Sequence, residues 1–198
     1  MEPVSKVYGN AIPLNRANVD TDQIIPAQYL KRIERTGYGP FAFEKWRNDP
    51  NFVLNDARYA GASILLCGAN FGSGSSREHA VWAIEDIGVK AMIAPSFGDI
   101  FKNNCSKIGL LTIELSEPDV QYLMARAEEL PDTKVEIDLE QQTVRADGWK
   151  RRFEVDAFVK YRLLNGLDDI GITLQAADDI DAYEAKRSDL LPATIAGA

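Results

Sequence analysis

The residues with the clearest chemical potential form a glycine-rich stretch at 68–80, GANFGSGSSREHA, called the serine loop below. An apolar run precedes it and helically spaced apolar residues follow it, which predicts a strand, a turn and a helix start. Unpaired N–H groups and the dipole at a helix N-terminus favour an anion. Arg77 adds a planar fork that matches a carboxylate or a phosphate. We therefore expect an anion site around Ser75, Ser76 and Arg77.

A structural interpretation of the serine loop is also open. Ser75 or Ser76 can cap the helix, with the glycines only making the turn. No Lys follows the last glycine, which excludes a Walker phosphate loop, and the absence of G-x-S-x-G excludes a nucleophile elbow. His79 lies four residues after Ser75, so a Ser–His pair is geometrically possible, although the spacing favours a structural histidine.

A second polar stretch, NVDTDQIIP at residues 18–26, is called the aspartate motif below. In an extended chain Asp20 and Asp22 lie on one face. Two such carboxylates can act as acid–base partners or bind a hard cation. Solvated loop aspartates are more common, and the spacing alone favours that interpretation.

The third stretch, residues 29–38, is called the basic segment and is expected to form one or two helical turns over 29–35. It combines the cations Lys31, Arg32 and Arg35 with the apolar residues Leu30 and Ile33. In a chain of net charge −8, it is one of few basic clusters. The mixture suits an anion that carries an aliphatic group, and an ordinary charged surface turn is an equal alternative.

Composition limits the classes of protein to which these stretches belong. The chain has 198 residues, of which 45% are hydrophobic and 26% charged, as expected for one globular domain. Net negative charge argues against nucleic acid or an anionic membrane as a partner. No run approaches the ~20 apolar residues of a membrane helix, and the N-terminus does not resemble a signal peptide. We expect a soluble, cytoplasmic protein.

The content of metal-binding side chains is low. Cys67 and Cys105 are the only cysteines and stand far apart, and His79 is the only histidine. Such a set predicts neither a disulfide scaffold nor a zinc site. We expect the chain to hold no metal alone.

The elements that must position these stretches alternate between strands and helices, with a hairpin at Asp147-Gly148. The expected strands are 7–14, 63–67, 91–94, 110–115, 135–139, 143–146, 149–155 and 170–174. Helices are expected over 41–46, 80–87, 156–165 and 176–187. Two further helices are expected, one that is opened by a Ser96–Asp99 capping box and ends near Gly109, and one that is capped by Ser116. The pattern indicates one α/β domain with β-hairpins.

Taken together, the chain resembles the small subunit of bacterial 3-isopropylmalate dehydratase, in the aconitase superfamily. The matching stretches are 18–30, 70–84, 94–111 and 165–175. The sequence GSSREHA at 74–80 is typical of the superfamily, and DTDQIIP at 20–26 favours the isopropylmalate branch. Ser73 departs from the pattern, since many relatives carry cysteine there, and we expect no change in chemistry from it.

The resemblance implies a single swivelling β/β/α domain over 1–198, like the mobile domain of aconitase, with a short C-terminal helix and tail over 176–198. It implies a hydro-lyase that converts 2-isopropylmalate and 3-isopropylmalate by dehydration and rehydration in leucine biosynthesis. The substrate is a small dicarboxylate. Activity requires a large subunit, which carries a [4Fe–4S] cluster, while this chain binds no cofactor.

The resemblance also implies roles for individual residues. Ser75 matches the superfamily's catalytic base, as an alkoxide stabilised by N–H dipoles and Arg77. Ser76 and Arg77 match ligands of a substrate carboxylate, and Asp22 matches an active-site aspartate. The family places one carboxylate-binding arginine after the aspartate motif, and Lys31, Arg32 and Arg35 all remain candidates for that role.

Substrate choice is expected to depend on the basic segment, where Leu30 and Ile33 can contact the isopropyl group. The same fold acting on homoaconitate or on a methylated malate derivative is a close alternative. A non-catalytic anion-binding module is an alternative from a different class.

Overall fold

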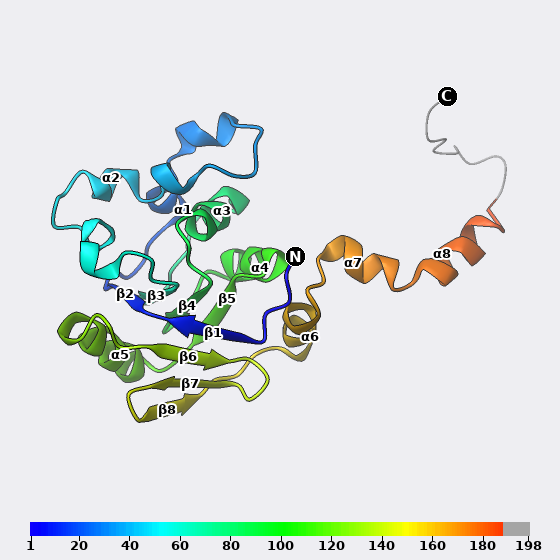
Figure 1. Ribbon diagram of the computed structural model, residues 1–198. Coiled ribbons are helices and arrows are strands. Elements are labelled where there is room, and N and C mark those ends of the chain that lie inside the picture. The colour runs from blue at the N-terminus through cyan, green and yellow to red at the C-terminus, as the bar shows by residue number, and fades with distance from the viewer. Residues whose placement is uncertain (188–198) are drawn as a thin grey trace.

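The computed structural model describes residues 1–187, so the tail expected over 188–198 lies outside the described residues. Its strands form two four-stranded sheets (Figure 1). The parallel sheet has the order β2 (Ala11–Leu14), β3 (Ile64–Cys67), β4 (Ala91–Ala94), β5 (Leu111–Glu114). The antiparallel sheet has the order β1 (Lys6–Gly9), β6 (Val135–Asp138), β7 (Thr143–Ala146), β8 (Trp149–Arg152).

The helices connect and cover these sheets (Figure 1). The α-helices are α1 (Thr21–Ile24), α2 (Glu44–Arg47), α3 (Glu78–Asp86), α4 (Asp99–Ile108), α5 (Glu117–Glu129), α6 (Ala157–Asn165), α7 (Asp169–Leu174) and α8 (Ala177–Glu184). Short 3-10 helices occupy Ala27–Lys31, Gly39–Phe41, Val53–Asn55 and Ala57–Tyr59.

The parallel sheet separates two hydrophobic cores because successive strand residues point to opposite faces. On one face, Leu65 and Met92 pack in a core shared with α3, α4 and the segments before β3. On the other face, Ile64 and Ile93 pack in a core shared with α5 and the antiparallel sheet. The expected α/β class with β/β/α layers is confirmed.

The expected single strand over 7–14 is two strands in different sheets. β1 pairs with β6 and β2 pairs with β3. The carbonyl of Asn10, between them, accepts hydrogen bonds from the backbone N–H groups of Ser63 and Ile64 at 3.2 Å each. Pro13 is tolerated in β2 because β2 is an edge strand.

The strand expected over 170–174 is wrong, since the segment forms α7. The Asp168 carboxylate accepts a hydrogen bond from the backbone N–H of Gly171 at 2.7 Å and caps this helix. Ile170 and Leu174 are 70% and 63% exposed, so the apolar alternation marks no buried face. Figure 1 shows α7 and α8 projecting from the sheets toward the C-terminus.

Two short helical predictions also needed correction. The helix expected over 29–35 ends at Lys31, because Arg32 is extended, with φ −73° and ψ 143°. The helix expected over 41–46 is interrupted by Phe43, whose φ of 56° is left-handed. The helices expected to end at Gly109 and Gly166 and to begin after Ser116 are confirmed.

In residues 1–187, no helix combines the length and apolar character needed to cross a membrane.

Candidate functional site

The aspartate motif follows β2, the serine loop follows β3, and both lie at the carboxyl edge of the parallel sheet. The Gly72 N–H donates to the Val19 carbonyl at 2.8 Å, and the Thr21 N–H donates to the Ser73 carbonyl at 3.0 Å. These bonds place two motifs that are distant in sequence side by side. The crevice outside the carboxyl ends of strands is where open α/β sheets bind ligands.

The loop after β4 supports the serine loop from its other side. The Phe71 N–H donates to the Ser96 carbonyl at 3.1 Å, and the Ser96 hydroxyl accepts from the Asn70 N–H at 2.9 Å. The expected Ser96–Asp99 capping box is therefore wrong, since this hydroxyl serves the neighbouring loop and Gly98 is the N-cap of α4. Gly72 has a φ of 75°, and a Cβ there would overlap the Phe101 ring.

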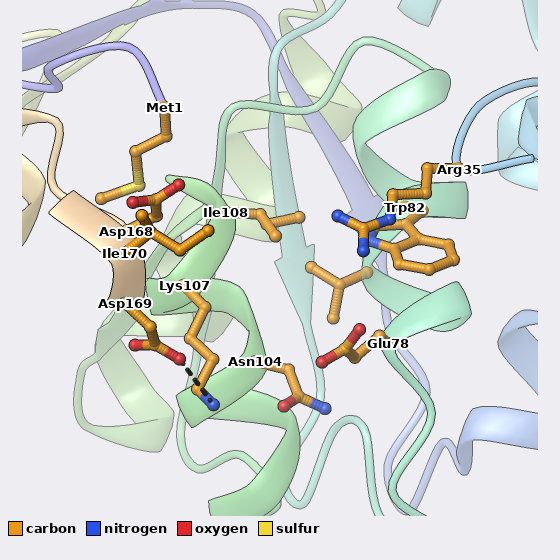
Figure 2. A pocket seen from close by; sticks show the side chains of 11 residues that line it. Met1, Arg35, Glu78, Trp82, Asn104, Lys107, Ile108, Asp168, Asp169 and Ile170 are labelled. Atoms are coloured by element: carbon orange, nitrogen blue, oxygen red, sulfur yellow. Dashed lines mark ion pairs between the residues drawn. The ribbon is translucent and has the colours of Figure 1, made fainter. Parts of the chain in front are cut away.

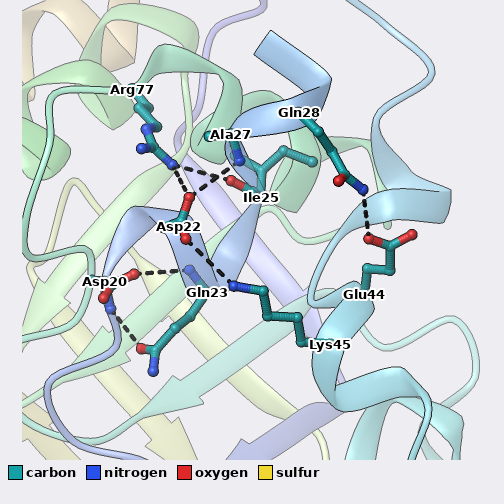
Figure 3. Close-up of polar contacts among 9 residues, drawn as sticks. All are labelled: Asp20, Asp22, Gln23, Ile25, Ala27, Gln28, Glu44, Lys45 and Arg77. Carbon is teal, nitrogen blue, oxygen red and sulfur yellow. Dashed lines mark hydrogen bonds and ion pairs between the residues drawn. The ribbon is translucent and has the colours of Figure 1, made fainter.

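Arg77 and Asp22 form the electrostatic centre of the site. Arg77 Nη1 donates to Asp22 Oδ1 at 2.7 Å and to the Ile25 carbonyl at 3.4 Å (Figure 3). Asp22 Oδ1 also accepts from the Ala27 N–H at 3.1 Å, and Lys45 Nζ lies 3.5 Å from Oδ2. The hydrogen bond from Arg77 lowers the pKa of Asp22, and the Ala27 and Lys45 contacts act in the same direction.

Asp20 and Asp22 do not share a face, contrary to the extended interpretation. Asp20 is the N-cap of α1, where its carboxylate accepts from the Gln23 N–H at 2.8 Å. The Gln23 side chain accepts from the Asp20 N–H in return, which completes a capping box (Figure 3). The turn of α1 thus directs only Asp22 toward Arg77.

Neither Ser75 nor Ser76 caps a helix, so the structural interpretation of these two serines is wrong. α3 begins at Glu78 with Arg77 as its N-cap, and no side chain caps it. Both serines are exposed, and Thr21 Oγ1 holds the Ser75 carbonyl at 2.9 Å. Within residues 1–187, no side chain forms a hydrogen bond with the Ser75 hydroxyl. The uncapped start of α3 provides N–H donors beside it.

His79 packs among aromatic rings. Its ring centroid lies 5.5 Å from that of Tyr38 and 4.7 Å from that of Trp82. Burial lowers the pKa of His79. This environment agrees with the structural interpretation of the histidine.

The side chains of the basic segment point in different directions. Arg32 lies over the rings of Tyr38 and Phe41, at 5.3 Å from each centroid. Arg35 lies 5.9 Å from the Trp82 ring. Lys31 is exposed and forms no ion pair with the described residues.

The two apolar residues of the basic segment differ in exposure. Leu30 is half-buried, whereas Ile33 is 95% exposed. No described side chain shields Ile33 from solvent, so it is free to contact a substrate or a partner.

A cavity of about 380 Å³ lies beside this site, between α3, α4 and α7 (Figure 2). Arg35 and Glu78 line it on one side, and Lys107 with Asp169, an ion pair at 3.2 Å, on the other. Ser75, Ser76, Arg77 and Asp22 do not line it. The structure therefore joins Asp22 to Arg77, whereas Arg35 lines a cavity that does not include Ser75, Ser76 or Arg77.

Sequence reasoning missed two residues that attach the basic segment to α3, Tyr38 and Asp86. Tyr38 is fully buried, and the carboxylate of Asp86 accepts from its backbone N–H at 2.6 Å. A signal was present, since His79, Trp82 and Asp86 follow helical spacing on α3 and so share a face.

The cysteines do not fit an iron–sulfur cluster. Cys67 on β3 and Cys105 on α4 are fully buried in the same core, and burial raises the pKa of both thiols well above the usual value. Iron binds the thiolate, which this environment disfavours. Within residues 1–187, no three His, Cys, Asp or Glu side chains are grouped to hold a metal ion.

Comparison with known families and proteins gives consistent matches. The Aconitase C-terminal domain matches residues 1–118, LeuD_N matches 121–157, and the C-terminal domain of the 3-isopropylmalate dehydratase small subunit matches 169–193. The 3-isopropylmalate dehydratase small subunit of Rubrobacter xylanophilus is 56% identical over 97% of this chain and 98% of its own. That of Acidothermus cellulolyticus is 53% identical over 98% of both chains.

A solved structure agrees with these matches. The 3-isopropylmalate dehydratase (LeuD) of Methanocaldococcus jannaschii is 28% identical and superposes with a TM-score of 0.63. The match covers 90% of this chain and 99% of that one.

Proposed function

Because the chain belongs to the family of 3-isopropylmalate dehydratase small subunits, we propose that it forms the active site of this hydro-lyase together with a large subunit. The reaction interconverts 2-isopropylmalate and 3-isopropylmalate through an alkene, in leucine biosynthesis. One observation supports this most directly: Asp22 holds the Arg77 guanidinium at 2.7 Å, and Arg77 follows the exposed Ser75 by two residues in the serine loop. A cation fixed next to a hydroxyl is what an alkoxide base requires.

In this proposal Ser75 takes the proton from the carbon next to a substrate carboxylate. The alkoxide form is stabilised by Arg77 and by the uncapped N–H groups at the start of α3. The Thr21 hydrogen bond to the Ser75 carbonyl holds the backbone at this position. When hydroxide leaves from the neighbouring carbon, the electrons of the broken C–H bond form the alkene.

A substrate carboxylate binds Ser76 and Arg77. The Arg77 side chain is 17% exposed, so part of its guanidinium remains accessible while Nη1 serves Asp22. Asp22 is the further catalytic candidate, and its contacts with Arg77 and Lys45 support a role in orienting the cation.

The basic segment supplies the remaining contacts. Leu30 and Ile33 contact the isopropyl group, and a cation among Lys31, Arg32 and Arg35 binds the second carboxylate. Arg32 already stacks on two rings and pairs with Glu34 at 3.7 Å. Arg35 is committed to the Trp82 ring, so Lys31 is the cation of the three that lacks a partner in the described residues.

The partner is the large subunit, and we place the [4Fe–4S] cluster, as the Lewis acid, on that subunit. Two features of this chain support a partner: the relatives are called small subunits, and the candidate site is open to solvent. Exposed Ile170, Leu174 and Tyr183 on α7 and α8 add apolar surface that an assembly can cover. The chain acts as one swivelling domain over 1–198, in the cytoplasm, on a small dicarboxylate.

Co-production with the large subunit tests the proposal. Under anaerobic conditions, the complex is expected to convert 3-isopropylmalate, with the alkene followed by its ultraviolet absorbance, while neither subunit turns over alone. Homoaconitate and a methyl-substituted malate are assayed in parallel. If either compound turns over faster than 3-isopropylmalate, that compound is the substrate. If the complex is inactive although the cluster is intact and the subunits are paired, the chain is an anion-binding module instead.

A further inference from the structure

The end of the basic segment is hydrogen-bonded to α3 through one carboxylate. Asp86, the last residue of α3, accepts hydrogen bonds on Oδ2 from the backbone N–H groups of Tyr38 at 2.6 Å and Gly39 at 3.3 Å. A Cβ at Gly39 would lie 3.2 Å from the Asp86 Cβ and carbonyl oxygen. The close approach of chain and helix thus depends on glycine at 39 and on the carboxylate at 86.

Tyr38 also contacts earlier residues of the basic segment. Its hydroxyl donates to the Glu34 carbonyl at 2.9 Å, which closes the turn over residues 34–38. Its ring is fully buried and packs against His79 and Trp82 of α3 and against the Arg32 guanidinium. The segment therefore has a fixed end at Tyr38, whereas Ile33 lies in solvent.

The opposite end of α3 begins at the serine loop. The helix is nine residues long, about 13 Å at 1.5 Å per residue, and its first turn follows Arg77 directly. The helix thus begins directly after the proposed base and carboxylate ligands and anchors the proposed substrate-selecting segment at its end. The contact between Tyr38 and His79, in the first turn of α3, links the basic segment to the end of α3 that follows the serine loop.

We propose that Asp86 is a positioning residue, which through Tyr38 sets the place of Leu30 and Ile33 relative to Ser75 and thereby contributes to substrate selection. The inference rests on the proposed function, because it assigns the segment to recognition of the substrate's alkyl group. Asp86 touches no reacting atom. Its effect is expected on discrimination between substrates rather than on the proton transfer.

The test uses three variants in complex with the large subunit. Asp86→Ala removes the acceptor of both hydrogen bonds, Asp86→Asn keeps one side-chain oxygen as an acceptor, and Glu85→Ala is the matched control. Glu85 is an exposed carboxylate on the same turn that forms no hydrogen bond or ion pair with the described residues. The readout is the ratio of kcat/KM for 3-isopropylmalate to kcat/KM for the methyl-substituted malate.

Asp86→Ala is expected to lower this ratio about tenfold, the discrimination that one misplaced apolar contact provides. Asp86→Asn is expected to restore most of it, and Glu85→Ala to leave it unchanged. An unchanged ratio in Asp86→Ala, or an equal loss in Glu85→Ala, overturns the inference. If Asp86→Ala fails to fold, Tyr38→Phe, which deletes only the hydroxyl bonded to Glu34, is expected to lower the ratio in the same direction.

A second measurement separates this inference from the proposed function. Hydrogen exchange of the Tyr38 and Gly39 amides in the isolated full chain is expected to accelerate in Asp86→Ala and not in Glu85→Ala. Accelerated exchange with an unchanged ratio shows that the attachment exists but does not select substrate, which overturns the inference alone. An inactive wild-type complex overturns the proposed function, and the inference with it.

Discussion

The guanidinium of Arg77 lies 2.7 Å from the carboxylate of Asp22, which is 55 residues earlier in the chain. Asp22 Oδ1 is shared between this ion pair and the Ala27 N–H, so the start of the 3-10 helix Ala27–Lys31, which leads into the basic segment, is bound to the same oxygen as the arginine. The pair thereby connects the aspartate motif, the serine loop and the basic segment. Loss of either charge is expected to disturb all three.

Ser75→Ala is expected to lower kcat by at least the 10²–10⁴-fold typical of a lost general base. Substrate affinity should change much less, because Arg77 and the backbone donors remain. Arg77→Ala should lower both kcat and substrate affinity. Steady-state kinetics and direct substrate binding on assembled complexes measure the difference, with Ser73→Ala in the same loop as the control. If Ser75→Ala keeps more than about a tenth of wild-type kcat, the loss is far smaller than that of a general base. The base would then lie elsewhere, and His79 is the next residue to substitute.

Asp22→Asn is expected to destabilise the folded chain by no more than about 1 kcal/mol at neutral pH, because the Asp22 side chain is 44% exposed. The pKa of Asp22 is lowered on folding, chiefly by Arg77. The contribution of the pair is therefore fully present above about pH 4, the unfolded value, and is lost as pH falls through the lowered pKa.

Urea unfolding of wild type and Asp22→Asn at several pH values from about 7 to 3 measures this dependence. The difference in free energy of unfolding should shrink below about pH 4. Asp132→Asn, at an exposed carboxylate outside any described ion pair, is the control. A difference that stays constant down to the acid end of the range would contradict the assignment of the pKa shift to folding.

Ile33→Ser is expected to leave the stability of the isolated chain unchanged within about 0.5 kcal/mol, because the side chain is almost fully exposed. In the assembled enzyme it should cost about 1–3 kcal/mol of discrimination between substrates with different alkyl groups. Thermal unfolding and relative kcat/KM values test the two statements separately. Identical discrimination in Ile33→Ser and in a matching Leu30→Ser variant would remove both residues from substrate selection.

The isolated chain, purified anaerobically, is expected to be colourless and to contain no stoichiometric iron or sulfide. Both thiols are buried, and their pKa values are raised, so neither offers a thiolate at the surface. Thiol titration should detect no rapidly reacting group in the native chain and two in urea. A stoichiometric cluster on this chain alone would overturn the two-subunit arrangement.

Much of the framework followed from local sequence signals. The buried runs at 63–67 and 91–94 are apolar without alternation, as strands covered on both faces must be. The Asp147-Gly148 turn has φ values of 45° and 79°, which its residue types accommodate, and it joins β7 to β8 as expected. Asp156 and Gly166 mark the ends of α6 by capping, which acts within a few residues.

The predictions that failed depended on neighbours that a local pattern does not contain. Alternation over 170–174 predicts a strand only if another strand edge and a core are present, and in their absence the Asp168 cap favours a helix. The serines at 75 and 76 match N-cap preferences, but the hydrogen bonds from Gly72 to Val19 and from Thr21 to Ser73 hold the preceding part of the loop against the aspartate motif, and α3 begins only at Glu78.

The sequence by itself therefore indicated which residues are candidates for the chemistry and where most strands and helices lie, because residue type, spacing and capping act over a few positions. Tertiary structure decided how those residues meet. The parallel register of β2 and β3 brings the aspartate motif onto the serine loop, which allows Asp22 to reach Arg77. The close passage of Gly39 over the end of α3 allows Asp86 to hold Tyr38. Both pairs are long-range contacts, so their formation depends on the folded sheet and helix rather than on the local chain.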